Sequence, residues 1–77
     1  MHQICFDYSK LLGRIKENGL TQAALAEKIG MSETTISLKL NNKADFSQRE
    51  IRKICNTLKI DDANIYGYFF NQKVQKN

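Results

Sequence analysis

The chain has 77 residues, of which 12 are lysine or arginine and 8 are aspartate or glutamate, giving a net charge of +4. A chain of this length builds one domain with a small core. Residues 1–8 lack the basic start and apolar run of a secretory signal, and no apolar segment approaches the roughly 20 residues that cross a bilayer. We therefore expect a cytoplasmic protein with no membrane partner, whose modest positive charge favours polyanions.

Helical periodicity runs through almost the whole sequence, so an all-α fold of five helices is predicted. The residues up to about Cys5 are expected to form an extended arm. Asp7 suits the N-cap of a first helix, with Phe6 and Leu11 spaced for a hydrophobic staple. That helix is predicted to run to about Asn18. Its inward-facing residues are expected to be Tyr8, Leu11, Leu12 and Ile15.

Residues 21–41 predict two short amphipathic helices joined by a tight turn. Thr21 and Ser32 are suited to cap the two helices, and Gly30 supplies the left-handed residue that commonly ends a helix. Two helices joined in this way form the unit that inserts its second helix into the major groove of DNA. The helices are predicted over 22–29 and from 33 to 40 or 41, with Ile36 and Leu40 on the inward face of the second.

The second half of the chain predicts a loop over 41–45 and then two further helices. Ser47 and Glu50 have the spacing of a capping box, flanked by Phe46 and Ile51 as a second staple. The apolar stripe of the fourth helix comprises Ile51, Ile54, Cys55 and Leu58.

The aromatic end of the chain is harder to assign from its pattern. Asp61 is expected to cap a fifth, short helix in which Ile65 and Phe69 face inward, although aromatic residues also suit a strand. The polar and basic residues 71–77 are predicted to form a mobile tail. The aromatic side chains exceed what one short helix buries, and the surplus predicts a homodimer interface formed by Tyr66, Tyr68 and Phe70.

Catalytic chemistry has little support in this sequence. No serine or cysteine has an evident base near it in sequence, and there is no phosphate-binding glycine loop. His2 and Cys5, with Cys55 as a distant third ligand, are a weak metal-site pattern, and two idle thiols are the simpler interpretation. We therefore expect no enzyme activity, no metal site, no cofactor and no small-molecule ligand.

A DNA-binding function has a physical basis in the second helix of the 21–41 unit. The outward positions of its first two turns carry side chains that can meet base edges. Thr34 and Ser37 form adaptable hydrogen bonds, and Leu38 suits a thymine methyl group. Glu33 could accept from a cytosine amino group, but it also repels phosphates and favours a first helical turn without DNA. The predicted base-reading residues are Glu33, Thr34, Ser37 and Leu38.

Phosphate contacts are expected from residues that flank this helix. Gln22 starts the first helix of the unit, where its amide and the helix N-terminus can meet a phosphate oxygen. Lys39, Asn41, Asn42 and Lys43 are placed to contact the DNA backbone at the far end. Solvation of a helix end and a loop is the alternative role of these polar residues.

Several short stretches carry a family resemblance. They are Leu20-Thr21-Gln22, Leu25-Ala26, Ile29-Gly30-Met31-Ser32, Ile36-Ser37 and Asn41-Asn42-Lys43. Together they resemble the helix-turn-helix domain of phage repressor and Cro-type regulators. Residues 46–51 and the end from 68 to 75 resemble short phage-type members. The resemblance implies a compact five-helix, lambda-repressor-like bundle.

The same resemblance implies roles for particular residues and one departure from the family pattern. In that family, the positions of Gln22 and Asn41 commonly contact phosphates, and those of Glu33, Thr34 and Leu38 face bases. Family members usually bury an apolar residue where this chain has Lys39. We therefore expect the end of this helix to be rotated or kinked.

The leading hypothesis is a Cro-like phage repressor that binds double-stranded DNA sequence-specifically, as a homodimer on a palindromic operator. The alternative is a protein-interaction module, such as an antitoxin or antirepressor, that grips a protein partner through its aromatic C-terminal end.

Overall fold

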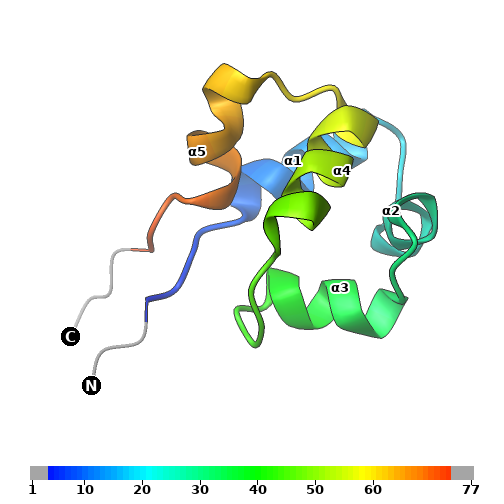
Figure 1. Ribbon diagram of the computed structural model, residues 1–77, viewed down its shortest axis with the longest axis horizontal. Coiled ribbons are helices and arrows are strands. Elements are labelled where there is room, and N and C mark those ends of the chain that lie inside the picture. The colour runs from blue at the N-terminus through cyan, green and yellow to red at the C-terminus, as the bar shows by residue number, and fades with distance from the viewer. Residues whose placement is uncertain (1–3, 74–77) are drawn as a thin grey trace.

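The computed structural model describes residues 4–73, and within them the chain forms five α-helices and one short 3-10 helix. The all-α, five-helix fold predicted from periodicity is therefore confirmed (Figure 1). Within residues 4–73, no helix is both long enough and apolar enough to span a membrane. The elements are α1 (Ser9–Glu17), α2 (Gln22–Ile29), α3 (Glu33–Leu40), α4 (Gln48–Leu58), η1 (Asp62–Asn64) and α5 (Ile65–Phe69).

Local capping defines the helix-turn-helix formed by α2 and α3. The Thr21 hydroxyl accepts a hydrogen bond from the Ala24 N–H at 3.1 Å, which satisfies one free donor of the first turn of α2. Ser32 does the same for Thr35 in α3, also at 3.1 Å. Gly30, with a φ of 75°, ends α2 in the left-handed conformation. The predicted caps and the predicted bounds of both helices are confirmed.

One apolar cluster lies between the helices and holds α3 against α2 and α4. Both inward residues predicted for α3, Ile36 and Leu40, are buried. Tyr8, Leu11 and Ile15 are also buried, as predicted for the first helix, and Leu12 is partly buried. The core residues are Tyr8, Leu11, Ile15, Leu25, Ala26, Ile29, Ile36, Leu40, Ile54, Cys55, Leu58, Ile60 and Phe69.

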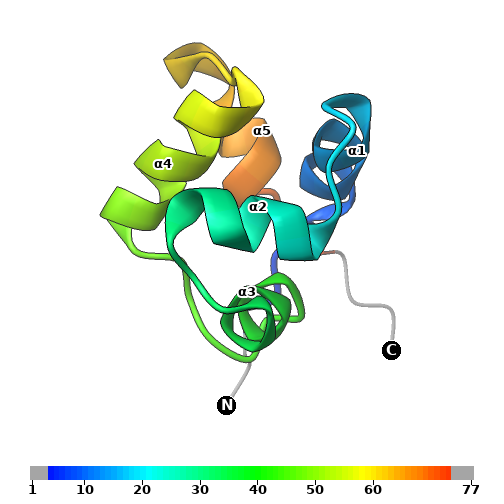
Figure 2. The same ribbon diagram turned by 90° about the vertical axis from the view of Figure 1, so that its right-hand side faces the viewer.

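Aromatic side chains attach α5 to the rest of the core. Phe69 is 2% exposed and meets Phe46 edge to face, with ring centroids 5.7 Å apart. Phe46 in turn meets Tyr8 edge to face at 5.6 Å. The aromatic end is thus a helix rather than the alternative strand, because its inward face completes the core on the α1 side (Figures 1 and 2).

Two predicted helix caps are formed differently from the prediction. Tyr8, not Asp7, is the N-cap of α1, although an Asp7 carboxylate oxygen accepts from the Ser9 N–H at 3.0 Å. The Asp61 side chain makes no capping hydrogen bond, and a 3-10 turn precedes α5. Asp7 therefore lies one residue before the N-cap position of α1. Asp61 is at the N-cap position of η1, which leads directly into α5, but its side chain does not cap the turn.

The first residues of the predicted tail are bound to the N-terminal arm. Phe6 and Gln72 form an antiparallel β-bridge. The Asp7 N–H donates to the Asn71 carbonyl at 2.6 Å, and the Lys73 N–H donates to the Cys5 carbonyl at 2.9 Å. The mobile-tail prediction is therefore wrong for residues 71–73, because backbone pairing holds them. Residues 74–77 lie outside the described residues.

Candidate nucleic-acid interface

The exposed face of α3 brings together the four residues predicted to read bases. Glu33, Thr34 and Leu38 are exposed and Ser37 is half-buried, because Ile36 and Leu40 turn the opposite face into the core. The four residues line one shallow hollow of about 330 Å³. Figures 1 and 2 show α3 on the outside of the bundle, at the end opposite η1. A long partner can therefore approach the outward face of α3.

The charge of this face comes from Glu33, the one ionisable residue lining the hollow. The basic residue nearest in sequence, Lys39, turns away from it. Leu38, with 46% of its side chain exposed, contributes the main apolar surface. The face is thus weakly acidic and partly apolar, rather than basic.

Lys39 is tied to α4. Its Nζ lies 2.6 Å from the Glu50 Oε1, and the two side chains are only 13% and 25% exposed. Helix α3 continues unbroken through Leu40, and Leu40 remains buried in the core. The ion pair lets a lysine occupy a position that would otherwise be apolar, and we leave Lys39 out of the phosphate-contacting set.

The same Glu50 carboxylate completes the capping box of α4. Its Oε1 accepts from the Ser47 N–H at 2.8 Å, and the Ser47 hydroxyl accepts from the Glu50 N–H at 3.1 Å. Burial raises the pKa of Glu50, but hydrogen bonds from Lys39 and Ser47 and the lysine charge together hold that pKa below its ordinary value. Glu50 thus couples the end of α3 to the start of α4.

Asn42 connects the helix-turn-helix to the N-terminal arm. Its Oδ1 accepts from the Phe6 N–H at 2.7 Å, and its Nδ2 donates to the Phe6 carbonyl at 3.0 Å. Its φ of 63° is left-handed, and the following Lys43 N–H donates to the Leu38 carbonyl at 2.8 Å, which closes the end of α3. Asn42 therefore has a structural role, and we also leave it out of the phosphate-contacting set.

Replacing Asn42 should separate its two contributions to stability. Asn42→Gly removes both hydrogen bonds but suits a left-handed φ, so we expect a loss of about 1–2 kcal/mol in the free energy of unfolding. Asn42→Ala removes the same bonds and adds a strained backbone, for a further loss of about 1 kcal/mol. Urea denaturation of both variants measures the difference. Equal stability of Asn42→Ala and the unchanged chain would contradict this role.

Three of the residues predicted to contact phosphate keep an accessible polar side chain. Gln22 is half-buried at the first position of α2, and Lys43 is exposed just beyond α3. Asn41 is exposed, and its Nδ2 donates to the Ser37 carbonyl at 2.8 Å. These residues lie at the start of α2 and past the end of α3, which are the flanks expected to meet a DNA backbone.

The residues predicted to form a dimer interface differ in exposure. Tyr66 is 67% exposed and Phe70 is 40% exposed, with ring centroids 6.3 Å apart. Tyr68 is half-buried, and the Lys10 ammonium lies 4.7 Å from its ring centroid. The exposed aromatic surface is therefore formed by Tyr66 and Phe70.

The cysteines lie apart from this face. Cys55 is buried in the core and Cys5 is half-buried in the arm. Burial raises the pKa of the Cys55 thiol, which keeps it protonated and unreactive at neutral pH. His2 lies outside the described residues, and among residues 4–73 no three metal-ligating side chains form a group.

The fold and the exposed α3 face define a small, all-α helix-turn-helix protein. The family model described as "Protein of unknown function (DUF739)" matches residues 4–72, and the chain belongs to this family. No curated protein matches the sequence.

A solved structure of a phage regulatory protein also matches this chain. The chain is similar to the modulator of repression (MOR) of the temperate bacteriophage TP901-1 from Lactococcus lactis, with 46% sequence identity and a TM-score of 0.76. The match covers 91% of this chain and 95% of that one. The chain is thus a homologue of a small phage regulatory protein, and a role in phage gene regulation is supported.

Proposed function

We propose that this chain is a phage transcriptional regulator that binds double-stranded DNA sequence-specifically through α3. The observation that carries the proposal is the α3 face, where Glu33, Thr34, Ser37 and Leu38 surround one hollow on the outside of the bundle. A helix held this way by α2 has the geometry that enters a major groove.

Each side chain has a proposed contact. Thr34 and Ser37 hydrogen-bond base edges, Leu38 packs on a thymine methyl group, and Glu33 accepts from a cytosine amino group. Gln22, Asn41 and Lys43 contact phosphates at the two flanks. The exposed rings of Tyr66 and Phe70 pair two copies on a palindromic operator.

Selection from a random pool of duplexes tests the proposal and reports the motif, its palindromy and the half-site spacing together. Binding of the selected duplex should weaken steeply as salt rises, since phosphate contacts release counterions. A pool that yields no preferred sequence, or binding that ignores salt, would count against DNA binding.

Variants should divide into two classes in that assay. Thr34→Ala and Leu38→Ala are expected to change the selected sequence, with about 5-fold to 150-fold less preference for the original base at the contacted position. Gln22→Ala should weaken all duplexes alike, by about 2-fold to 10-fold. Lys28→Ala, on the exposed side of α2, is the control and should alter neither property. An unchanged motif in both α3 variants would exclude base reading by this helix.

A second function is supported by the charge of α3. Its exposed face carries Glu33 and no cation, since Lys39 pairs with Glu50, and such a face gives DNA binding little electrostatic help. The similar phage protein is named a modulator of repression, and a modulator can act by binding a repressor protein instead of DNA. In this case the chain, added to a complex of the phage's repressor and operator, removes the repressor without itself binding the duplex. A mobility-shift titration with each component alone distinguishes the two functions.

A further inference from the structure

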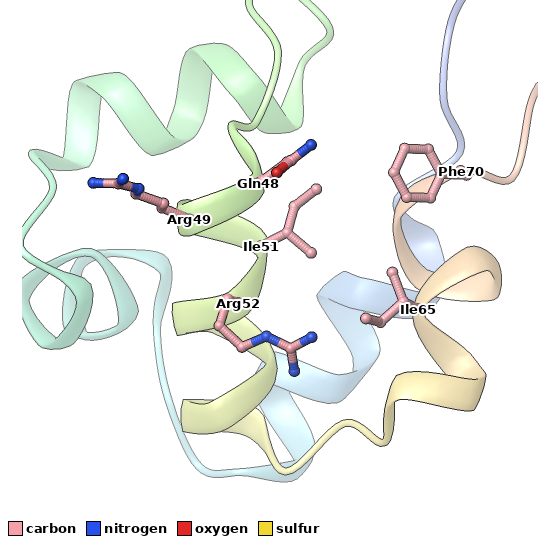
Figure 3. A pocket seen from close by; sticks show the side chains of 6 residues that line it. All are labelled: Gln48, Arg49, Ile51, Arg52, Ile65 and Phe70. Carbon is pink, nitrogen blue, oxygen red and sulfur yellow. The ribbon is translucent and has the colours of Figure 1, made fainter.

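A groove of about 450 Å³ lies between α4 and α5. Figure 3 shows Ile51 of α4 pointing across it toward Ile65 and Phe70, which come from α5 and its C-terminal end. Ile51 and Ile65 are partly buried against the core, so they form a fixed floor, and Phe70 remains 40% exposed beside them. The residues that line the groove are Gln48, Arg49, Ile51, Arg52, Ile65 and Phe70.

The side of the groove formed by α4 carries one guanidinium, that of Arg52. Arg52 extends toward Ile65, whereas Arg49 leaves the other side of the helix (Figure 3). Arg52 bonds Asp62 through Nη1 at 2.7 Å, but both side chains are largely exposed, at 52% and 75%. A guanidinium has five N–H donors, so Arg52 can bind a second carboxylate without losing Asp62. No acidic residue lines the groove.

We propose that this groove binds an amphipathic helical segment of a protein partner. An aliphatic or aromatic side chain of that segment lies between Ile51 and Phe70, and an aspartate or glutamate one turn away binds Arg52. This inference rests on the second of the functions proposed above. It adds where the partner binds and which side chains it presents.

The apolar floor and Arg52 favour such a segment over two other occupants. DNA phosphates match the arginines, but they would leave Ile51, Ile65 and Phe70 without an apolar contact. A second copy that pairs through the same groove about a two-fold axis brings no carboxylate to Arg52, because no acidic residue lines the groove. Its exposed Leu38 with Glu33 would require a head-to-tail contact, which forms rings or filaments rather than a two-fold dimer.

Panning of a random peptide library displayed on phage against the immobilised full chain tests the proposal. The enriched peptides should combine a large apolar residue with aspartate or glutamate one turn away. Phe70→Ser should weaken binding of an enriched peptide about 30-fold or more, and Arg52→Met about 2-fold to 5-fold. Lys53→Met changes the same charge on the same helix but lines a different hollow, so it should have no effect.

Several outcomes would overturn the proposal that this groove binds a partner. These are no enrichment, enrichment of basic peptides, equal loss in Arg52→Met and Lys53→Met, or displacement of the peptide by duplex DNA. If sedimentation shows a dimer that becomes monomeric when the peptide binds, the groove is instead the contact between two copies of the chain. If Phe70→Ser still removes the repressor from its operator, the protein-partner function stands and only the groove is wrong.

Discussion

Phe69→Ala is expected to lose about 3–5 kcal/mol of unfolding free energy, which is the usual cost of emptying a buried phenylalanine site. Phe69 is 2% exposed and is the one fully buried residue of α5. Its ring meets Phe46 edge to face, and α5 packs against α1. Native domains have a free energy of unfolding of only about 5–15 kcal/mol, so the variant should be partly unfolded at 37 °C.

Its neighbour Phe70 provides the matched control. Phe70→Ala removes the same atoms from a ring that is 40% exposed, so the expected loss is about 1–2 kcal/mol. Urea denaturation followed by circular dichroism gives both values. If the Phe70 variant were the less stable of the two, the burial described for α5 would be wrong.

Glu50→Ala is expected to lose about 2–4 kcal/mol of unfolding free energy, the second-largest effect. It removes the capping box of α4, and it leaves the Lys39 ammonium without its partner on a side chain that is 13% exposed. Glu17→Ala is the control, because Glu17 also forms an ion pair, with Arg14, but its side chain is 66% exposed. This variant should change the free energy of unfolding by less than about 0.5 kcal/mol. Equal losses in the two variants would show that the Lys39–Glu50 pair adds nothing.

The Glu50 carboxylate also predicts how stability depends on pH. Its pKa is below the ordinary value of 4.5 in the folded chain, so the folded state favours the ionised form. This contribution is complete above about pH 4.5 and is lost as pH falls through the lower, folded pKa. Glu50→Gln has no such titration, so the stability difference between it and the unchanged chain should shrink on acidification. Urea midpoints at pH 7 and in the acid range measure this; a constant difference would contradict it.

Helix boundaries and caps were predictable because they depend on neighbours in the sequence. Thr21, Gly30, Ser32 and the Ser47–Glu50 box act within one turn of backbone, so residue type and spacing are enough to place them. Asp7 was misplaced by one residue, and Asp61 occupies the N-cap position of η1 without a capping hydrogen bond, because residue type alone does not fix the geometry of the first turn.

The candidate site was only partly predictable. The base-reading set follows from the inward positions of Ile36 and Leu40, which fix the outward face of α3 by periodicity alone. Lys39 and Asn42 were assigned to DNA because both are polar and near that face. Their partners, Glu50 and Phe6, are 11 and 36 residues away, and no local rule reports contacts at such separation. A partial signal existed for Asn42, since asparagine after a helix end tolerates a left-handed φ.

The sequence by itself determined that this chain is an all-α helix-turn-helix protein, which helices it forms, and which side of α3 faces outward. Only the tertiary structure decided which polar residues remain available to a partner and where α4 and α5 leave an apolar groove. The physical reason is the range of the interactions. Capping and helical periodicity act within one or two turns, whereas ion pairs, arm contacts and grooves depend on how distant helices pack.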